Sequence, residues 1–197
     1  MSGLFSQLTG NGDDDGNEFY TSYETYMPQY LPEPGTALEG HRLLTGEDHI
    51  RVHQLAKKLF EDRGVYDMTF GYNLAKLNLD TRHPEAGYRY ALDGDDDSVL
   101  HAEFTPTTPF CPQSDTLTIG SFRAWNGLAE QHEFDIVKVS VAATHHRSDN
   151  INAELRALEQ QLLKTGSISG ADFSDLDSMQ APTEEYPSPD KQPEAPF

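Results

Sequence analysis

Residues 134–142 read Phe-Asp-Ile-Val-Lys-Val-Ser-Val-Ala and form the clearest strand pattern in the chain. Valine occupies every second position from Val137 onward, and the residues between include Lys138 and Ser140. A period of two is typical of a strand that turns one face toward a core. This segment therefore predicts a half-buried strand, and the other elements are placed relative to it.

A second strand is expected over 99–104, because Val99, Leu100, Ala102 and Phe104 follow one another and prolines come directly after. Apolar residues at helical spacing predict a helix before this strand, from a cap at Thr45 to a stop near Gly64. A second helix is expected to join the two strands, with proline in its first turn. It starts at Pro112 and carries Leu117, Ile119, Phe122 and Trp125.

The last helix follows the valine strand and is expected to be capped by Ser148 or Asp149. Its apolar stripe is Ile151, Leu155, Leu158 and Leu162. The order helix, strand, helix, strand, helix predicts a single domain of the α/β (α+β) class, with a small mixed sheet and helices packed on it. Residues 65–98 show no clean period, and no element is assigned there.

The chain has 197 residues with 33 acidic and 14 basic side chains, a formal net charge of -19. Such a charge argues against nucleic acid as a partner, since phosphate-backbone binding needs lysine and arginine. It also argues against an anionic membrane surface. With few lysines and many acids, the composition resembles that of proteins from a high-salt cytoplasm, although acidic tails in an ordinary cell would look the same. We expect a cytoplasmic protein.

Composition divides the chain into three parts. Residues 1–40 contain no lysine or arginine and form an acidic, tyrosine-rich N-terminal extension, of which 19–34 are expected to pack over the domain. Residues 41–165 form the α/β domain. Residues 166–197 are rich in Ser, Asp, Pro and Glu and are expected to be a disordered tail.

The loop after the first strand carries the single cysteine, Cys111. Three prolines between Pro106 and Pro112 frame it, and the cysteine is expected at the N-terminus of the following helix. Free backbone N–H groups and the helix dipole would favour a thiolate there, so Cys111 is a candidate nucleophile or soft-metal ligand. The alternative is a small buried apolar side chain.

The loop after the valine strand reads Ala143-Thr-His-His-Arg-Ser148. If the two strands are parallel, both loops leave the same end of the sheet. His145 or His146 could then act on the thiol or share a metal with it. The alternative is that the histidines face solvent and the loop only shapes a turn.

Two weaker candidates are better explained as solvated surface. His49 and His53 stand four residues apart on the first helix but have no evident third ligand. The aspartates at 95–97 and 13–15 lack the spacing of a calcium loop.

Over about residues 99–163 the chain resembles the metal–sulfur cluster assembly factor family, which includes the bacterial SufT and PaaD proteins and the eukaryotic cytosolic iron–sulfur targeting component. The likeness rests on an ordered set of short motifs. They are the run from Ala102 to Pro112 (Ala-Glu-Phe-Thr-Pro-Thr-Thr-Pro-Phe-Cys-Pro), then Ile119-Gly120, the valine strand, Thr144-His145, and Ile151-Asn152 with Leu155. The nearest match to the family's acidic "DPE" element is His83-Pro-Glu85.

The resemblance implies an adaptor, not a turnover enzyme, that helps to deliver iron–sulfur clusters to client apo-proteins together with other assembly factors. The motif cysteine is Cys111, and the residues implied to support it are Thr105, Thr107, Thr108, Thr144 and His145, together with Glu85 from the nearest match to the acidic element. A cluster needs about four ligands. Any iron–sulfur cluster would therefore be transient and completed by a homodimer, a partner's cysteines or small thiols.

Two other functions stay open. One is a thiol-dependent enzyme in which His145 is the base for Cys111, which would need an orienting group and a substrate pocket. The other is a metal-free protein-interaction module.

Overall fold

The valine strand is β6 (Ile136–Val141), and it pairs in parallel with β5 (Val99–Thr105), from Val99 opposite Ile136 to Phe104 opposite Val141. The computed structural model describes residues 19–168. Their four-stranded sheet has the order β1-β4-β5-β6, in which β1 (Arg42–Leu43) and β4 (Gly87–Leu92) are antiparallel to their neighbours. A short hairpin of β2 (Tyr66–Asp67) and β3 (Tyr72–Asn73) stands apart from it. The predicted mixed sheet is confirmed.

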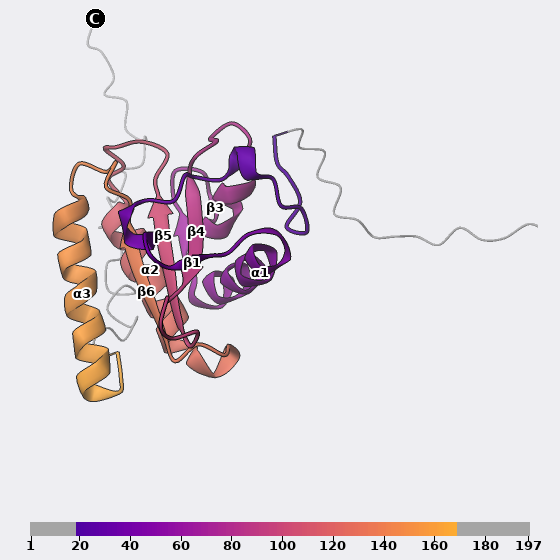
Figure 1. Cartoon of the computed structure of the whole chain (residues 1–197). Coiled ribbons are helices and arrows are strands. Elements are labelled where there is room, and N and C mark those ends of the chain that lie inside the picture. Colours follow the sequence, from indigo (N-terminus) through magenta and orange to yellow (C-terminus); the bar gives the residue numbers. More distant parts are fainter. Residues whose placement is uncertain (1–18, 169–197) are drawn as a thin grey trace, which may run out of the picture.

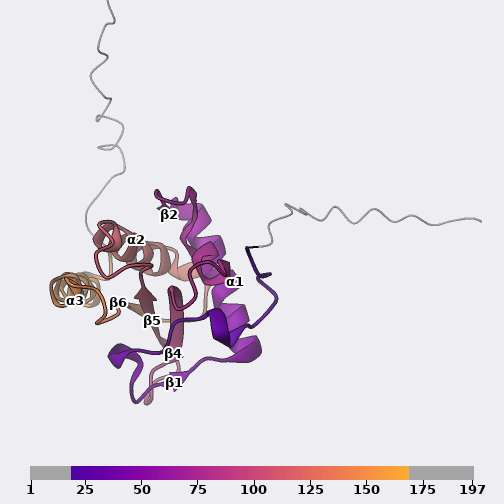
Figure 2. The ribbon, with the colours of Figure 1, turned by 90° about the horizontal axis from the view of Figure 1, so that it is seen from above.

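Helices α1 (Gly46–Arg63) and α2 (Ser114–Gly127) cover one face of this sheet, and α3 (Ser148–Thr165) lies beside its β6 edge (Figures 1 and 2). Helix α2 makes the crossover between β5 and β6, which is why these strands are parallel. Helix α3 packs along β6 and α2 at the edge of the layer. The fold is a single α/β domain, as expected.

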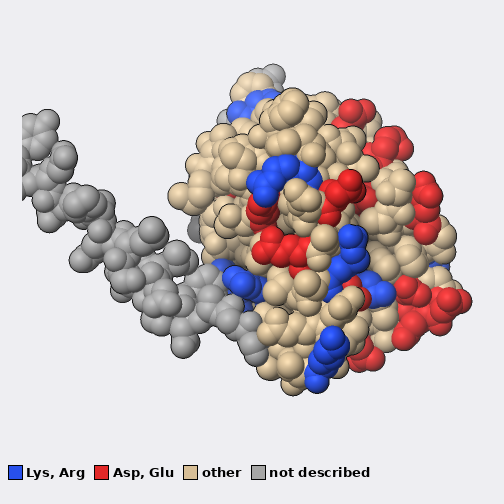
Figure 3. All heavy atoms as spheres, turned by 90° about the vertical axis from the view of Figure 1, so that its left-hand side faces the viewer, with Lys and Arg blue, Asp and Glu red and all other residues tan. Residues whose placement is uncertain are grey.

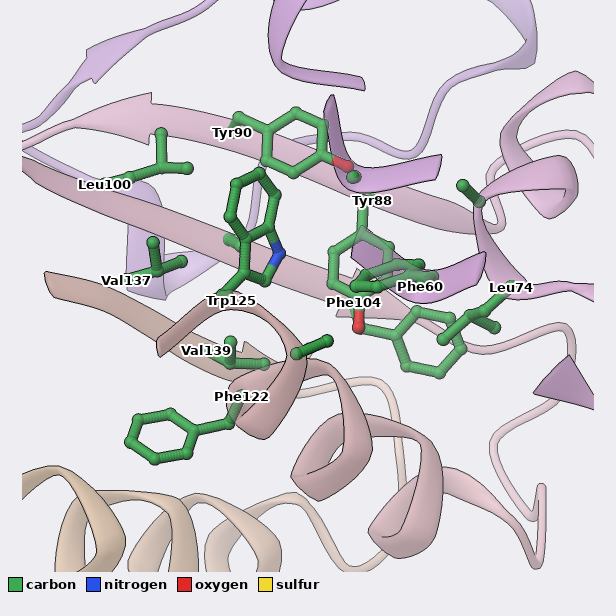
Figure 4. Close-up of a cluster of buried hydrophobic side chains, with 14 of the residues drawn as sticks. Phe60, Leu74, Tyr88, Tyr90, Leu100, Phe104, Phe122, Trp125, Val137 and Val139 are labelled. Carbon is green, nitrogen blue, oxygen red and sulfur yellow. The ribbon is translucent and has the colours of Figure 1, made fainter. Parts of the chain in front are cut away.

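Aromatic side chains from four elements make the centre of the core (Figure 4). Tyr88 and Tyr90 of β4 stack on each other with ring centroids 5.9 Å apart, and Trp125 of α2 meets the Tyr90 ring edge-on. Phe60 of α1 contacts both Tyr88 and Trp125. The indole is fully buried, so α1 and α2 are held on the sheet mainly by apolar burial.

Residues 19–40 run over the domain, as the tyrosine-rich pattern predicted for 19–34. Leu31 and Leu38 are buried, and Tyr20 forms an isolated bridge with Asp80. Farther along, the Glu103 carboxylate of β5 accepts backbone N–H groups from Gly35 at 2.6 Å and Ala37 at 3.3 Å. The segment thus covers part of the sheet face that the helices leave open, visible as the indigo trace in Figure 2.

Strand β4 is the main element that the sequence did not indicate. All six of its residues are buried, Arg89 and Ala91 included, so the polar face that would mark a half-buried strand is missing. A 3₁₀ helix (Leu74–Leu79) precedes it, and Asn78 there bonds both the N–H and the C=O of Tyr88.

The free edge of β6 is covered by asparagine side chains. Asn126 of α2 pairs with the N–H and C=O of Val137, and Asn152 of α3 does the same for Val141. An unpaired edge would invite pairing with another chain. The two helices therefore close the sheet with hydrogen bonds as well as with apolar contacts.

Two helix starts differ from the predictions. Helix α2 begins at Ser114, not Pro112, and the N-cap of α3 is Arg147, not Ser148 or Asp149. Helix α1 has the expected limits, with Thr45 as N-cap and Gly64 in the left-handed conformation at φ 66°.

Across residues 19–168 no helix combines the length and apolar character needed to cross a bilayer. The expectations for residues 1–18, including Asp13–Asp15, and for 169–197 fall outside the described part of the chain.

Candidate functional site

The loops after β5 and β6 meet at one end of the sheet, because these strands are parallel neighbours. Pro109 lies where they touch. Its carbonyl accepts the backbone N–H of His146 at 2.9 Å and also bonds the imidazole Nδ1 of that residue at 2.8 Å. An ion pair of 3.0 Å between Arg147 and Asp115 joins the starts of α3 and α2. The two loops therefore form one surface.

Cys111 lies half-buried on this surface, three residues before the first residue of α2. Its own N–H donates to the Thr108 carbonyl at 3.3 Å, and its carbonyl accepts the Ser114 N–H at 3.4 Å. The expectation that the cysteine stands at the helix N-terminus is wrong. The three prolines extend the loop through a further turn, and the helix begins only after Gln113.

His145 reaches Cys111 through the backbone and not through the sulfur. The imidazole Nε2 lies 3.1 Å from the Cys111 carbonyl oxygen, and Nδ1 accepts the Arg147 N–H at 3.3 Å. This pattern requires a neutral ring with its hydrogen on Nε2. Both nitrogens of the buried ring are thus engaged by the backbone, and His145 positions the loop.

The remaining residues implied by the family resemblance line one hollow of about 320 Å³ beside this loop. They come from three separate segments of the chain: Glu85; Thr105, Thr107 and Thr108; and Thr144. Glu85 stands just before β4 and has a positive φ of 68°, which is strained for a residue with a side chain. Its neighbours Arg82 and His83 line the same hollow.

Arg82 anchors the rim of this hollow to a buried carboxylate. Its Nε and Nη2 donate to the two oxygens of Asp80 at 2.8 and 2.7 Å, and Nη2 also donates to the Tyr20 hydroxyl at 2.6 Å. Burial by itself raises the pKa of Asp80, but the hydrogen bonds and charge of Arg82 outweigh it and bring that pKa below its usual value. Asp80 is therefore a buried anion with one cationic partner.

Phe110, next to Cys111, is the most prominent apolar side chain of this surface, with 71% of it exposed. Its ring lies 5.0 Å from that of His146. A partner that docked on this surface would bury the Phe110 ring together with the cysteine loop.

A second hollow lies on the open face of β5 and β6, against α3. It measures about 540 Å³ and is lined by side chains of both signs, among them Glu103, Lys138, Arg156 and Glu159. Figure 3 shows acidic and basic side chains interspersed on the α3 side of the molecule. This groove lacks the single-sign charge of a nucleic-acid or polyanion site.

His49 and His53 do not lie on a solvated face, so that interpretation is wrong. His49 and His53 are 4% and 3% exposed, and their rings lie against those of Tyr26 and Tyr23 of the N-terminal segment. The sequence shows them as polar residues on a helix, and the expected packing of residues 19–34 over the domain does not indicate that these two side chains lie beneath that segment. The aspartates at 95–97 are exposed in a turn, as predicted.

One group of candidate residues was missed altogether. His41, Asp93 and His101 place their ligand atoms within 4.8 Å of one another, at the end of the sheet away from Cys111. Because each comes from a different segment with no spacing motif, no signal in the sequence could have joined them.

The fold and its loops define a one-domain α/β protein with a thiol-bearing surface at the carboxyl end of two parallel strands. The chain belongs to the family described as a domain of unknown function, DUF7998, which matches residues 18–169. Comparison with curated proteins and with solved structures found no match to either.

Proposed function

We propose that this protein is an adaptor in metal–sulfur cluster assembly or targeting, which presents Cys111 to client apo-proteins and to other assembly factors. The observation that carries the proposal is the convergence of Glu85, the threonines of the proline loop, and Thr144 around one hollow beside the cysteine loop. These residues belong to short motifs that lie far apart in the sequence. In this proposal the protein works in the cytoplasm and uses neither nucleic acid nor a membrane.

The geometry at Cys111 favours an adaptor over a thiol-dependent enzyme. A catalytic thiol needs a base within hydrogen-bond reach. Both ring nitrogens of His145 are hydrogen-bonded to backbone groups. Within residues 19–168 no side chain hydrogen-bonds to the Cys111 sulfur. The exposed Phe110 beside it suits docking of another protein.

A single cysteine supplies one of the roughly four ligands that an iron–sulfur cluster needs. In the proposed function the cluster is cargo, held transiently while a second copy of the chain, a client or small thiols provide the other ligands. The metal-free interaction module is the second candidate, favoured by the same exposed Phe110.

The test is anaerobic purification of the full chain with its bound partners, followed by assays of iron and acid-labile sulfide. Wild type should carry both in proportion to co-purified client, and Cys111→Ser should lose them while keeping its circular dichroism spectrum. The matched control is Ser98→Ala, a hydroxyl change at the other end of β5. Client without metal in wild type would favour the interaction module, and metal retained in Cys111→Ser would refute a role for the thiol.

A further inference from the structure

The end of the sheet opposite Cys111 brings together two histidines and one aspartate. His41 directly precedes β1, Asp93 directly follows β4, and His101 is the third residue of β5. Antiparallel pairing sets Arg42 opposite Leu92 and Ala91 opposite His101, so all three residues fall at the same corner. Since Leu100 and Ala102 face the core, the His101 side chain must point to the open face.

The ligand atoms at this corner are close and partly shielded from solvent. Asp93 Oδ2 lies 2.9 Å from Nε2 of His101 and 3.6 Å from Nδ1 of His41. The two imidazoles are stacked, with ring centroids 3.8 Å apart. The three side chains are between 12% and 23% exposed, so they are held in place while the corner stays open to solvent.

We propose that His41, Asp93 and His101 form a binding site for a divalent transition-metal ion. Two imidazoles and one carboxylate are a set of ligands that first-row metals such as zinc accept. Ligand atoms on a tetrahedral ion at about 2.0–2.1 Å lie roughly 3.4 Å from one another. The separations of 2.9 and 3.6 Å bracket that value, and the two stacked rings must turn relative to each other so that both lone pairs point at one ion.

The hydrogen bonds around His41 favour the ring form that a metal requires. The Gly94 N–H donates to His41 Nδ1 at 3.2 Å, so this nitrogen carries a lone pair directed toward the Asp93 turn. An ion would replace that long hydrogen bond. At His101 the metal ion would take the place of the hydrogen atom in the hydrogen bond between Nε2 and the Asp93 carboxylate.

The charges nearby suit a cation. Asp95, Asp96 and Asp97 follow Asp93 in the exposed turn, and of these Asp97 is paired with Arg42 at 3.0 Å. Lys138 is opposite His101 on β6, but its ammonium group points to Glu159, 4.0 Å away. The turn therefore leaves a net negative field at the corner.

This site is independent of the proposed function. Cys111 lies in the loop beyond Thr105, the last residue of β5, whereas His101 lies near the first, so a metal at this corner is not cargo on the cysteine. A tetrahedral ion with three protein ligands keeps one position for water. His101 also lines the groove on the open sheet face, which connects the corner to that groove.

The experiment uses Co²⁺ as the probe with the full chain, after treatment with a chelator. Wild type should bind one Co²⁺ with a visible absorption spectrum typical of nitrogen and oxygen ligands, without the near-ultraviolet bands of a thiolate. His101→Asn and Asp93→Asn should each weaken binding by at least about 100-fold, more than the 10–100-fold typical of outer-shell changes. Asp95→Asn is the matched control: it removes one solvent-screened charge from the same turn and no ligand, so it should weaken binding far less than the ligand variants.

A second readout guards against misfolded variants. Zn²⁺ should raise the thermal midpoint of wild type and of Asp95→Asn, because a ligand that binds only the folded state stabilises it. It should not raise the midpoint of His41→Asn. The proposal is overturned if wild type shows no saturable binding below about 1 mM Co²⁺, if the site variants bind like wild type, or if Cys111→Ser abolishes the spectrum.

Discussion

His145 is joined to Cys111 by a hydrogen bond of 3.1 Å that ends on the backbone carbonyl of the cysteine and leaves the thiol alone. The buried imidazole thus fixes the loop that carries Cys111, while the sulfur remains available on the surface. The sequence could not distinguish two roles for His145, activation of the Cys111 thiol and positioning of the loop, and this hydrogen bond supports the second.

Removing the His145 ring should therefore loosen the cysteine loop. We expect His145→Ala to lower the free energy of unfolding by about 1–3 kcal/mol, because buried backbone groups lose a partner. Labelling of Cys111, the only cysteine in the chain, by a thiol-reactive dye should become faster. His146→Ala, at an exposed ring, should change stability less, and equal losses in both variants would contradict the positioning role.

The buried Asp80 should make Arg82 important for stability. Arg82→Ala leaves the buried Asp80 carboxylate without its cationic partner, and we expect a clear loss of stability in urea unfolding. Arg51→Ala breaks an ion pair of 2.7 Å with Glu133 whose side chains are both more than half exposed, so it should cost less than about 1 kcal/mol. A comparable loss in both variants would show that Asp80 is not held as a buried anion.

The buried His49 and His53 should make the protein sensitive to mild acid. Burial lowers the pKa of His53 to about 4 and that of His49 to about 3, with His53 and Arg89 further disfavouring a charge on His49. The titratable and charged groups around the pair are Tyr23, Tyr26, Arg89 and Tyr90. In the unfolded chain both histidines titrate near the usual value of about 6.5.

Between these values the unfolded state binds protons that the folded state does not. Stability is therefore full above about pH 6.5 and falls as the pH drops, by roughly 1.4 kcal/mol per pH unit for each histidine. Urea unfolding at pH 7 and pH 5 measures this. The difference should shrink by about 2 kcal/mol in His53→Gln and stay unchanged in His146→Gln; an unchanged difference in His53→Gln would show that His53 titrates normally when folded.

If the cysteine surface docks client proteins, Phe110 should be its anchor. Phe110→Ala is expected to weaken client capture about tenfold, the loss typical of an exposed aromatic that becomes buried in an interface. Leu163→Ala is the control, since that side chain is 67% exposed but lies at the far end of α3. Capture assays with immobilised full-length protein measure both. Equal capture by wild type and Phe110→Ala would show that the client interface does not include Phe110.

The hydrophobic periodicity of the sequence was sufficient to predict the elements that have one exposed face and one buried face. The alternation around Val137 predicted β6, and the stripes of α1 and α3 predicted those helices, because period and exposure agree there. The parallel pairing of β5 and β6 followed from the crossover helix, and with it the meeting of the Cys111 and His145 loops. For these parts sequence reasoning sufficed.

Only the tertiary structure decided which residues are buried or brought together by segments that are distant in the sequence. Strand β4 is buried on both faces, Arg89 and Ala91 included, so it lacks the alternation of buried and exposed residues that identifies a strand in a sequence. His49 and His53 are buried between Tyr90 of β4 and residues 19–31, which fold over α1. His41, Asp93 and His101 share no spacing, and antiparallel strand pairing alone brings them to one corner. Periodicity in a sequence reports how one element meets solvent, whereas these features depend on which distant segment replaces that solvent.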